Sequence, residues 1–97
     1  MAYLNETIHQ PVRLRIMAAL VTLEPGNEVD FTYLRDLLEV TDGNLGAHLH
    51  KLEEAGYIAV NKTFVERKPR TFVSATPEGR RVFQEHVAAL EAILKSK

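Results

Sequence analysis

The chain has 97 residues, 45% of them hydrophobic and 26% charged, and its 12 basic and 13 acidic residues leave a formal net charge of −1. A chain of this length supports one compact core, so we expect a single domain over residues 1–97. The absence of cysteine excludes a disulfide framework, a thiolate metal centre and a cysteine nucleophile. No apolar run approaches the roughly 20 residues of a membrane-spanning helix, and residues 1–10 lack the basic-then-apolar order of a signal peptide. We therefore expect a cytoplasmic protein with no membrane partner.

A first helix is predicted from Pro11, a residue that fits the first turn of a helix. Its apolar residues recur at helical spacing on one face: Val12, Ile16, Ala19, Leu20 and Leu23. The sequence Glu-Pro-Gly-Asn at residues 24–27 ends this helix, because proline lacks an amide hydrogen and Gly and Asn tolerate turn conformations. A short strand is expected next, over residues 28–31.

Two short helices follow and predict a helix-turn-helix. In the first of them Thr32 is the expected N-cap, Phe31 lies just outside, and the helix ends near Glu39. Its apolar positions are Leu34, Leu37 and Leu38. The second helix follows a break at residues 40–43 and ends before Gly56, a residue suited to the position after a helix C-cap. Its apolar stripe recurs at i, i+4 and i+7 and consists of Leu45, Leu49 and Leu52.

After this helix the apolar spacing changes to two, which predicts a β-hairpin. Its strands are residues 57–60 and 71–75, and the charged, proline-bearing segment 66–70 is the expected loop, which should project into solvent. A last helix begins at Thr76-Pro77-Glu78, with Thr76 as the N-cap and Pro77 at the first helical position. This helix should run close to the C-terminus.

The predicted elements therefore follow the order helix, short strand, helix, helix, hairpin, helix. The fold class is α+β and mainly helical, without internal repeats. This is the element order of a winged helix-turn-helix domain, in which the hairpin is called the wing.

Positive charge gathers around the predicted wing. Residues 61–81 contain six basic and two acidic residues, a local charge of +4, whereas the rest of the chain carries −5. The basic residues of the wing itself are Lys62, Arg67, Lys68 and Arg70. Such a distribution suits a phosphate backbone even though the pI is near 6.4. The alternative is a solvated hairpin loop, which is commonly charged as well.

The helix that carries the leucine stripe is the candidate recognition helix. A rotation of about 100° per residue turns Asn44, Ala47 and Lys51 away from the stripe and places His48 on its flank. Asn can form two hydrogen bonds with adenine, Lys can reach guanine or phosphate, and Ala leaves room for a thymine methyl group. The alternative is an ordinary surface helix whose polar face meets only water.

Neither a metal centre nor an enzyme active site is predicted. His48 and His50 diverge on their helix, and no cysteine is present to complete a site. The chain has no Gly-rich phosphate loop and no Gly-x-Ser-x-Gly turn. His86 lies between Val82 and Ala89 on an apolar helix face, where a packing role is expected. We therefore expect no cofactor and no catalytic activity.

The last helix carries two adjacent apolar stripes, one more than a domain of this size covers. The first stripe consists of Phe83, Val87, Leu90 and Leu94. The second consists of Val82, His86, Ala89 and Ile93. Because one stripe would stay exposed without a partner chain, we expect a dimer interface made of Val82, His86, Ala89, Leu90, Ile93 and Leu94. The alternative is a monomer in which this helix is unusually deeply buried.

Five segments of the chain carry a family resemblance. They are Pro11-Val12-Arg13 with Ile16 and Leu20, Thr41–Leu45, His48-Leu49 through Leu52–Tyr57, Lys62–Thr71 and Thr76–Arg80. In this order and spacing they resemble the small winged-helix transcriptional regulators related to the MarR and ArsR groups. The resemblance covers nearly the whole chain.

The resemblance implies a homodimer that inserts its recognition helix into the major groove of double-stranded DNA and lays its wing on the neighbouring backbone or minor groove. The expected DNA contacts are Thr41, Asn44, Ala47, His48, Lys51, Lys62, Arg67, Lys68 and Arg70. The expected function is sequence-specific regulation of transcription, as a repressor that occupies a promoter, and a small-molecule effector would bind at the dimer interface. The alternative is a winged-helix module that binds another protein and not DNA, because one fold hosts many functions.

Overall fold

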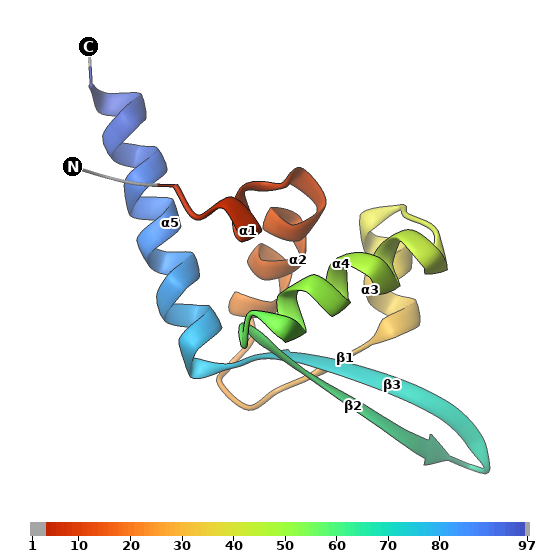
Figure 1. Ribbon diagram of the computed structural model, residues 1–97. Coiled ribbons are helices and arrows are strands. Elements are labelled where there is room, and N and C mark those ends of the chain that lie inside the picture. Colours follow the sequence, from red (N-terminus) through yellow and green to blue (C-terminus); the bar gives the residue numbers. More distant parts are fainter. Residues whose placement is uncertain (1–3, 97) are drawn as a thin grey trace.

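Helices and strands follow one another in the order predicted for a winged helix-turn-helix protein (Figure 1). The computed structural model describes residues 4–96. Its elements are α1 (Glu6–His9), α2 (Pro11–Val21), β1 (Val29–Asp30), α3 (Phe31–Leu38), α4 (Asp42–Glu54), β2 (Ile58–Val65), β3 (Lys68–Ala75) and α5 (Pro77–Lys95). The winged-helix fold is thereby confirmed, and α1 is an addition that the sequence did not predict.

Side-chain caps determine where the main helices begin. Thr76 accepts a hydrogen bond from the Gly79 amide at 2.9 Å, which confirms the predicted start of α5. The predicted N-cap of α3 is wrong by two residues, because Asp30 and not Thr32 holds that position. Asp30 has extended backbone angles at the end of β1, and its carboxylate accepts from the Thr32 amide at 2.7 Å. Phe31 is therefore the first helical residue and does not lie outside the helix.

The wing is longer, and its turn tighter, than the sequence predicted. β2 and β3 are eight residues each and pair antiparallel, while β1 pairs with β3 on the other side. Only Glu66 and Arg67 form the turn, both with positive φ, 53° and 68°. The predicted five-residue loop is wrong for residues 68–70, which belong to β3. A two-residue turn with both residues in the left-handed region matches the twist of the flanking strands, so pairing continues to the tip.

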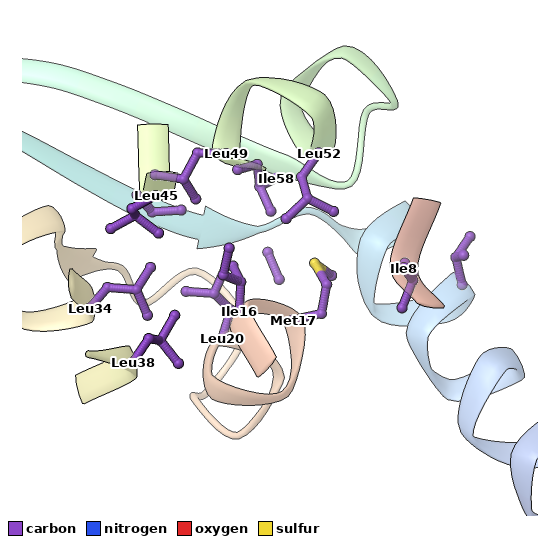
Figure 2. Close-up of a cluster of buried hydrophobic side chains, with 13 residues drawn as sticks. Ile8, Ile16, Met17, Leu20, Leu34, Leu38, Leu45, Leu49, Leu52 and Ile58 are labelled. Atoms are coloured by element: carbon purple, nitrogen blue, oxygen red, sulfur yellow. The ribbon is translucent and has the colours of Figure 1, made fainter. Parts of the chain in front are cut away.

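The core lies where α2, α3 and α4 meet the base of the sheet. Figure 2 shows the three α4 leucines on one side of this cluster and the α2 residues Ile16, Met17 and Leu20 on the other. In α3, Leu34 and Leu38 are buried four residues apart, whereas Leu37, the third of its apolar positions, is 50% exposed. Leu37 is turned about 100° from Leu38 around the helix axis and away from the cluster.

The short helix α1 connects the two ends of the chain. Asn5 caps it by accepting from the Ile8 amide at 3.0 Å, and Ile8 is fully buried. The Asn5 amide donates to His86 Nδ1 at 3.0 Å, and His9 Nδ1 lies 3.4 Å from His86 Nε2. In Figure 1, α1 lies between α2 and α5. Four helical residues give too little periodicity to be recognised in the sequence.

Because α1 and α2 pack against α5, the first three residues of one of its two apolar stripes are buried inside the chain. Val82, His86 and Ala89 are 7%, 2% and 6% exposed. The prediction that these three residues form a dimer interface is therefore wrong, since a partner chain cannot reach them. Ile93 and Leu94 are 50% and 78% exposed, and Leu90 is half-buried.

Gly79 and Gly46 should respond in opposite directions to the same substitution. A Cβ at Gly79 would lie 1.9 Å from the Tyr57 carbonyl oxygen, whereas a Cβ at Gly46 meets nothing within 4 Å. Gly79→Ala should lower the free energy of unfolding by about 3 kcal/mol, because helix α5 must shift off the backbone. Gly46→Ala, the control, should raise it by about 0.5–1 kcal/mol, because alanine favours a helix interior. Urea titration of both variants measures the two values, and equal small effects would contradict the close approach.

Candidate nucleic-acid interface

Helix α4 is fixed by its inner face and leaves its outer face open. Thr41 caps it by accepting from the Asn44 amide at 3.1 Å. Leu45, Leu49 and Leu52 are at most 4% exposed and hold the helix on the core. Among the predicted contacts, Thr41, Asn44, Ala47 and Lys51 are all exposed. The outer face of α4 thus presents an amide, a small side chain and a cation along about 20 Å of helix.

His48 lies on the flank of α4, as predicted, but it has a partner that the sequence did not reveal. Arg13 of α2 places Nη1 3.1 Å from His48 Nδ1, while its Nε donates to the Thr7 carbonyl oxygen of α1. Burial, and then the positive charge of Arg13, lower the pKa of His48. Since arginine only donates, His48 Nδ1 is the acceptor and the neutral ring carries its proton on Nε2. His48 therefore offers a neutral N–H donor beside the outer face of α4.

The basic residues of the wing do not form one patch. Side chains alternate between the two faces of a strand, and directly paired residues share a face. Lys62 and its partner Thr71 line a hollow of about 360 Å³ between the sheet and α4, together with Gly46, His50 and Glu53. Arg70, which pairs with Thr63, lies on the opposite face, as does Lys68. Arg67 stands in the turn.

Arg70 is held by an acidic partner close to α3. Its Nη1 lies 2.6 Å from Asp30 Oδ2, the other oxygen of the carboxylate that caps α3. Asp30 therefore ties the wing to the helix-turn-helix and neutralises the charge of Arg70. In the part of the chain that the structure describes, no acidic side chain forms an ion pair with the other wing cations, Lys62, Arg67 and Lys68.

Arg35 of α3 is a charged residue beside the start of α4 that the sequence did not point to. Its guanidinium lies 2.8 Å from Asp42, in the first turn of α4, and 3.0 Å from Asp36. The hydrogen bond to Asp42 and then that to Asp36 raise the pKa of Arg35. The negative charge of Asp42 at the start of α4 is thus balanced from α3. No local pattern marks Arg35, because its partner lies across the turn between the two helices.

The arrangement offers no metal site of three ligands within residues 4–96. His48 and His50 are both on α4, and His48 faces Arg13 and not its neighbour. His9 and His86 do approach each other, on the far side of α2. In the same described region, no helix has the length and apolar character needed to span a membrane.

Comparison with known proteins finds one matching family and several similar chains. The family described as winged helix DNA-binding domain matches residues 12–94. An uncharacterized protein of Methanocaldococcus jannaschii is 35% identical over 85 residues, which is 88% of this chain and 89% of that protein. A transcriptional regulator homologue from Pyrococcus horikoshii OT3 is 31% identical with a TM-score of 0.83, covering 93% of this chain and 86% of the other. A MarR-family regulator from Enterococcus faecalis V583, 23% identical over 94% of this chain and 78% of its own, has a TM-score of 0.72 and shows a shared fold.

The half-buried His48 and the buried His86 should make the fold less stable in mild acid. Burial, followed by the charge of His9, lowers the pKa of His86, and the pKa of His48 is lowered as well. At a pH below the ordinary histidine pKa of about 6.5, the unfolded chain binds protons that the folded chain does not. The contribution of these histidines to the free energy of unfolding is therefore complete above that pH and is lost as the pH decreases through it. Thermal unfolding midpoints measured between pH 7.5 and pH 5.5 should therefore decrease, and His86→Asn, which keeps an acceptor near Nδ1, should decrease less. His50→Asn, at an exposed site on α4, is the matched control and should follow the wild type; a wild-type midpoint independent of pH would contradict the argument.

Proposed function

Because the chain belongs to the winged helix DNA-binding domain family, we propose that it is a sequence-specific regulator of transcription that binds double-stranded DNA as a homodimer. One observation supports this most directly: the outer face of α4 is exposed beside a wing whose Lys62, Arg67 and Lys68 form no ion pair with an acidic side chain of residues 4–96. The major groove of DNA is wide enough for one α-helix, and the phosphates on either side of the groove attract cations. Repression is the simplest mode of action, since occupying a promoter needs no further activity.

In this proposal α4 enters the major groove with its N-terminal half. Asn44 is the candidate reader of adenine, and Ala47, one turn further, leaves space for a thymine methyl group. Lys51 contacts guanine or phosphate. His48 donates from Nε2 to a phosphate, because its Nδ1 is occupied by Arg13. Thr41, at the helix start, lies close to the backbone as well.

The wing supplies contacts that do not depend on sequence. Arg67 at the turn and Lys68 beside it reach the backbone or minor groove next to the site of α4. Lys62, on the face that borders α4, contacts the phosphates between the two. We assign Arg70 a different role from the one predicted: it holds the wing in place through Asp30.

The homodimer uses the far half of α5. In Figure 1 this half extends beyond the other elements. Its apolar residues Leu90, Ile93 and Leu94 are half-buried or exposed. A second copy related by two-fold symmetry would cover them. Two recognition helices then reach half-sites about one helical turn apart.

Binding to a duplex should depend steeply on salt. Three unpaired wing cations per protomer would neutralise about six phosphates in a dimer, which predicts a slope of log affinity against log salt of about −5 or steeper. Fluorescence anisotropy with a labelled mixed-sequence duplex measures it. Arg67→Ala should weaken binding to all sequences and flatten the slope by about 2, since the dimer loses two contacts. Arg81→Ala, an exposed arginine of α5 already paired with Glu78 and Glu85, is the charge-matched control and should keep the wild-type slope; absence of binding at low salt would refute DNA binding.

The dimer interface can be tested separately from DNA. Leu94→Glu places a charge in the proposed contact, so the sedimentation coefficient at micromolar concentration should change from that of a dimer to that of a monomer. Leu37→Glu is the control, because Leu37 is also an exposed leucine, 50% against 78%, but lies on α3. A wild-type monomer, or a dimer that Leu94→Glu leaves intact, would argue against this interface.

A further inference from the structure

The wing carries a large apolar side chain that the core does not use. Phe64 is 72% exposed, near the end of β2 and two residues before the turn. An exposed phenylalanine leaves a large apolar surface in water. Neither the packing of the wing nor the phosphate contacts proposed above account for it.

Phe64 lies directly opposite another apolar residue. The register of β2 and β3 pairs it with Pro69, so the two side chains share one face of the hairpin. Because side chains alternate along a strand, Phe64 is on the face of Val60 and Lys62, which line the hollow beside α4. The apolar pair therefore lies on the face of the sheet that borders α4.

The turn keeps this pair in register. Glu66 and Arg67 both adopt left-handed backbone angles, which cost energy for residues other than glycine. A two-residue turn of this kind fixes which residues of the two strands oppose each other. The hairpin thus presents Phe64 and Pro69 together, a short distance behind a charged tip.

The surroundings of Phe64 suit a polyanion better than a protein. Lys62 shares the face of Phe64 and Arg67 stands in the turn, while residues 61–70 contain a single acid, Glu66. Burial of this tip against an apolar protein surface would strip water from unpaired cations. Lysine interrupts both free edges of the wing, at Lys62 of β2 and at Lys68 of β3, and Pro69 adds a residue without an amide donor on the β3 edge, which disfavours pairing with a further strand.

We propose that Phe64 and Pro69 form an apolar wedge that enters the minor groove of duplex DNA and bends it by partly unstacking one base step. The inference rests on the proposed function, since it assigns a further contact to the same wing. Apolar side chains inserted between base steps are a recurrent means of bending DNA from the minor groove. The wing cations bring the strand close, and the wedge then exchanges stacking of bases for stacking on the phenyl ring. Flexible steps such as TA lower the cost of this deformation.

Energy transfer between dyes at the two ends of a duplex of about 30 base pairs, with a central TA step, tests the wedge. The wild-type protein at low salt should raise the transfer efficiency, because bending shortens the distance between the ends. Phe64→Ala should weaken binding about tenfold and abolish the rise. Its salt slope should stay that of the wild type, because no charge is removed. Phe64→Leu, which keeps an apolar side chain, should retain part of both effects.

Val65→Ala is the matched control, since Val65 is the next residue of β2, is 40% exposed and points to the opposite face. It should bind and bend as the wild type does. Wild-type affinity and transfer efficiency in Phe64→Ala would overturn the wedge while leaving DNA binding intact. A Phe64→Ala variant that changes the sedimentation coefficient and not the bend would overturn it too, by assigning Phe64 to a protein contact. Absence of wild-type binding at low salt would refute both the wedge and the proposed function.

Discussion

Burial of the leucine stripe of α4 is the interaction on which the candidate interface depends. Leu45, Leu49 and Leu52 pack against α2 and the base of the sheet (Figure 2), and each fully buried leucine is worth about 1.5–3 kcal/mol. The stripe decides the rotation of α4 about its own axis. Once it is buried, Asn44, Ala47 and Lys51 have no orientation other than outward. The same contact sets the distance between α4 and the wing, because β2 follows α4 after a short turn through Gly56.

Polar side chains connect the elements around this core. Asp30 caps α3 with one oxygen and binds Arg70 of β3 with the other, so one carboxylate links the helix-turn-helix to the wing. Arg13 links α1 and α4 through the Thr7 carbonyl oxygen and His48. Arg80 of α5 donates to the carbonyl oxygens of Val21 and Leu23 at the end of α2. Each of these three arginines donates to backbone or side-chain acceptors at a junction between two elements of the fold.

The wing shows that basic residues close together in a sequence can have different surroundings once they lie in a β-hairpin. Four basic residues within nine positions look equivalent in the sequence, but they take three different places. Lys62 borders α4, Arg67 is at the turn with Lys68 beside it, and Arg70 is bound to Asp30. The same alternation brings Phe64 and Pro69, which are unremarkable as separate residues, onto one surface.

Features that depend on local spacing could be predicted from the amino-acid sequence alone. The winged-helix order, the leucine stripe of α4 and the cap at Thr76 follow from periodicity and from a side chain that bonds to an amide three residues away. The cap at Thr41 was not predicted, because the sequence indicates a break over residues 40–43, whereas α4 begins at Asp42. Features that depend on partners distant in the chain could be found only in the three-dimensional fold. Which stripe of α5 is buried depends on contacts with α1, more than 70 residues earlier in the chain. The ion pair that occupies Arg70 joins it to Asp30, 40 positions away. Local signals carry no information on such pairs, because burial and ion pairing are set by which elements the fold brings side by side.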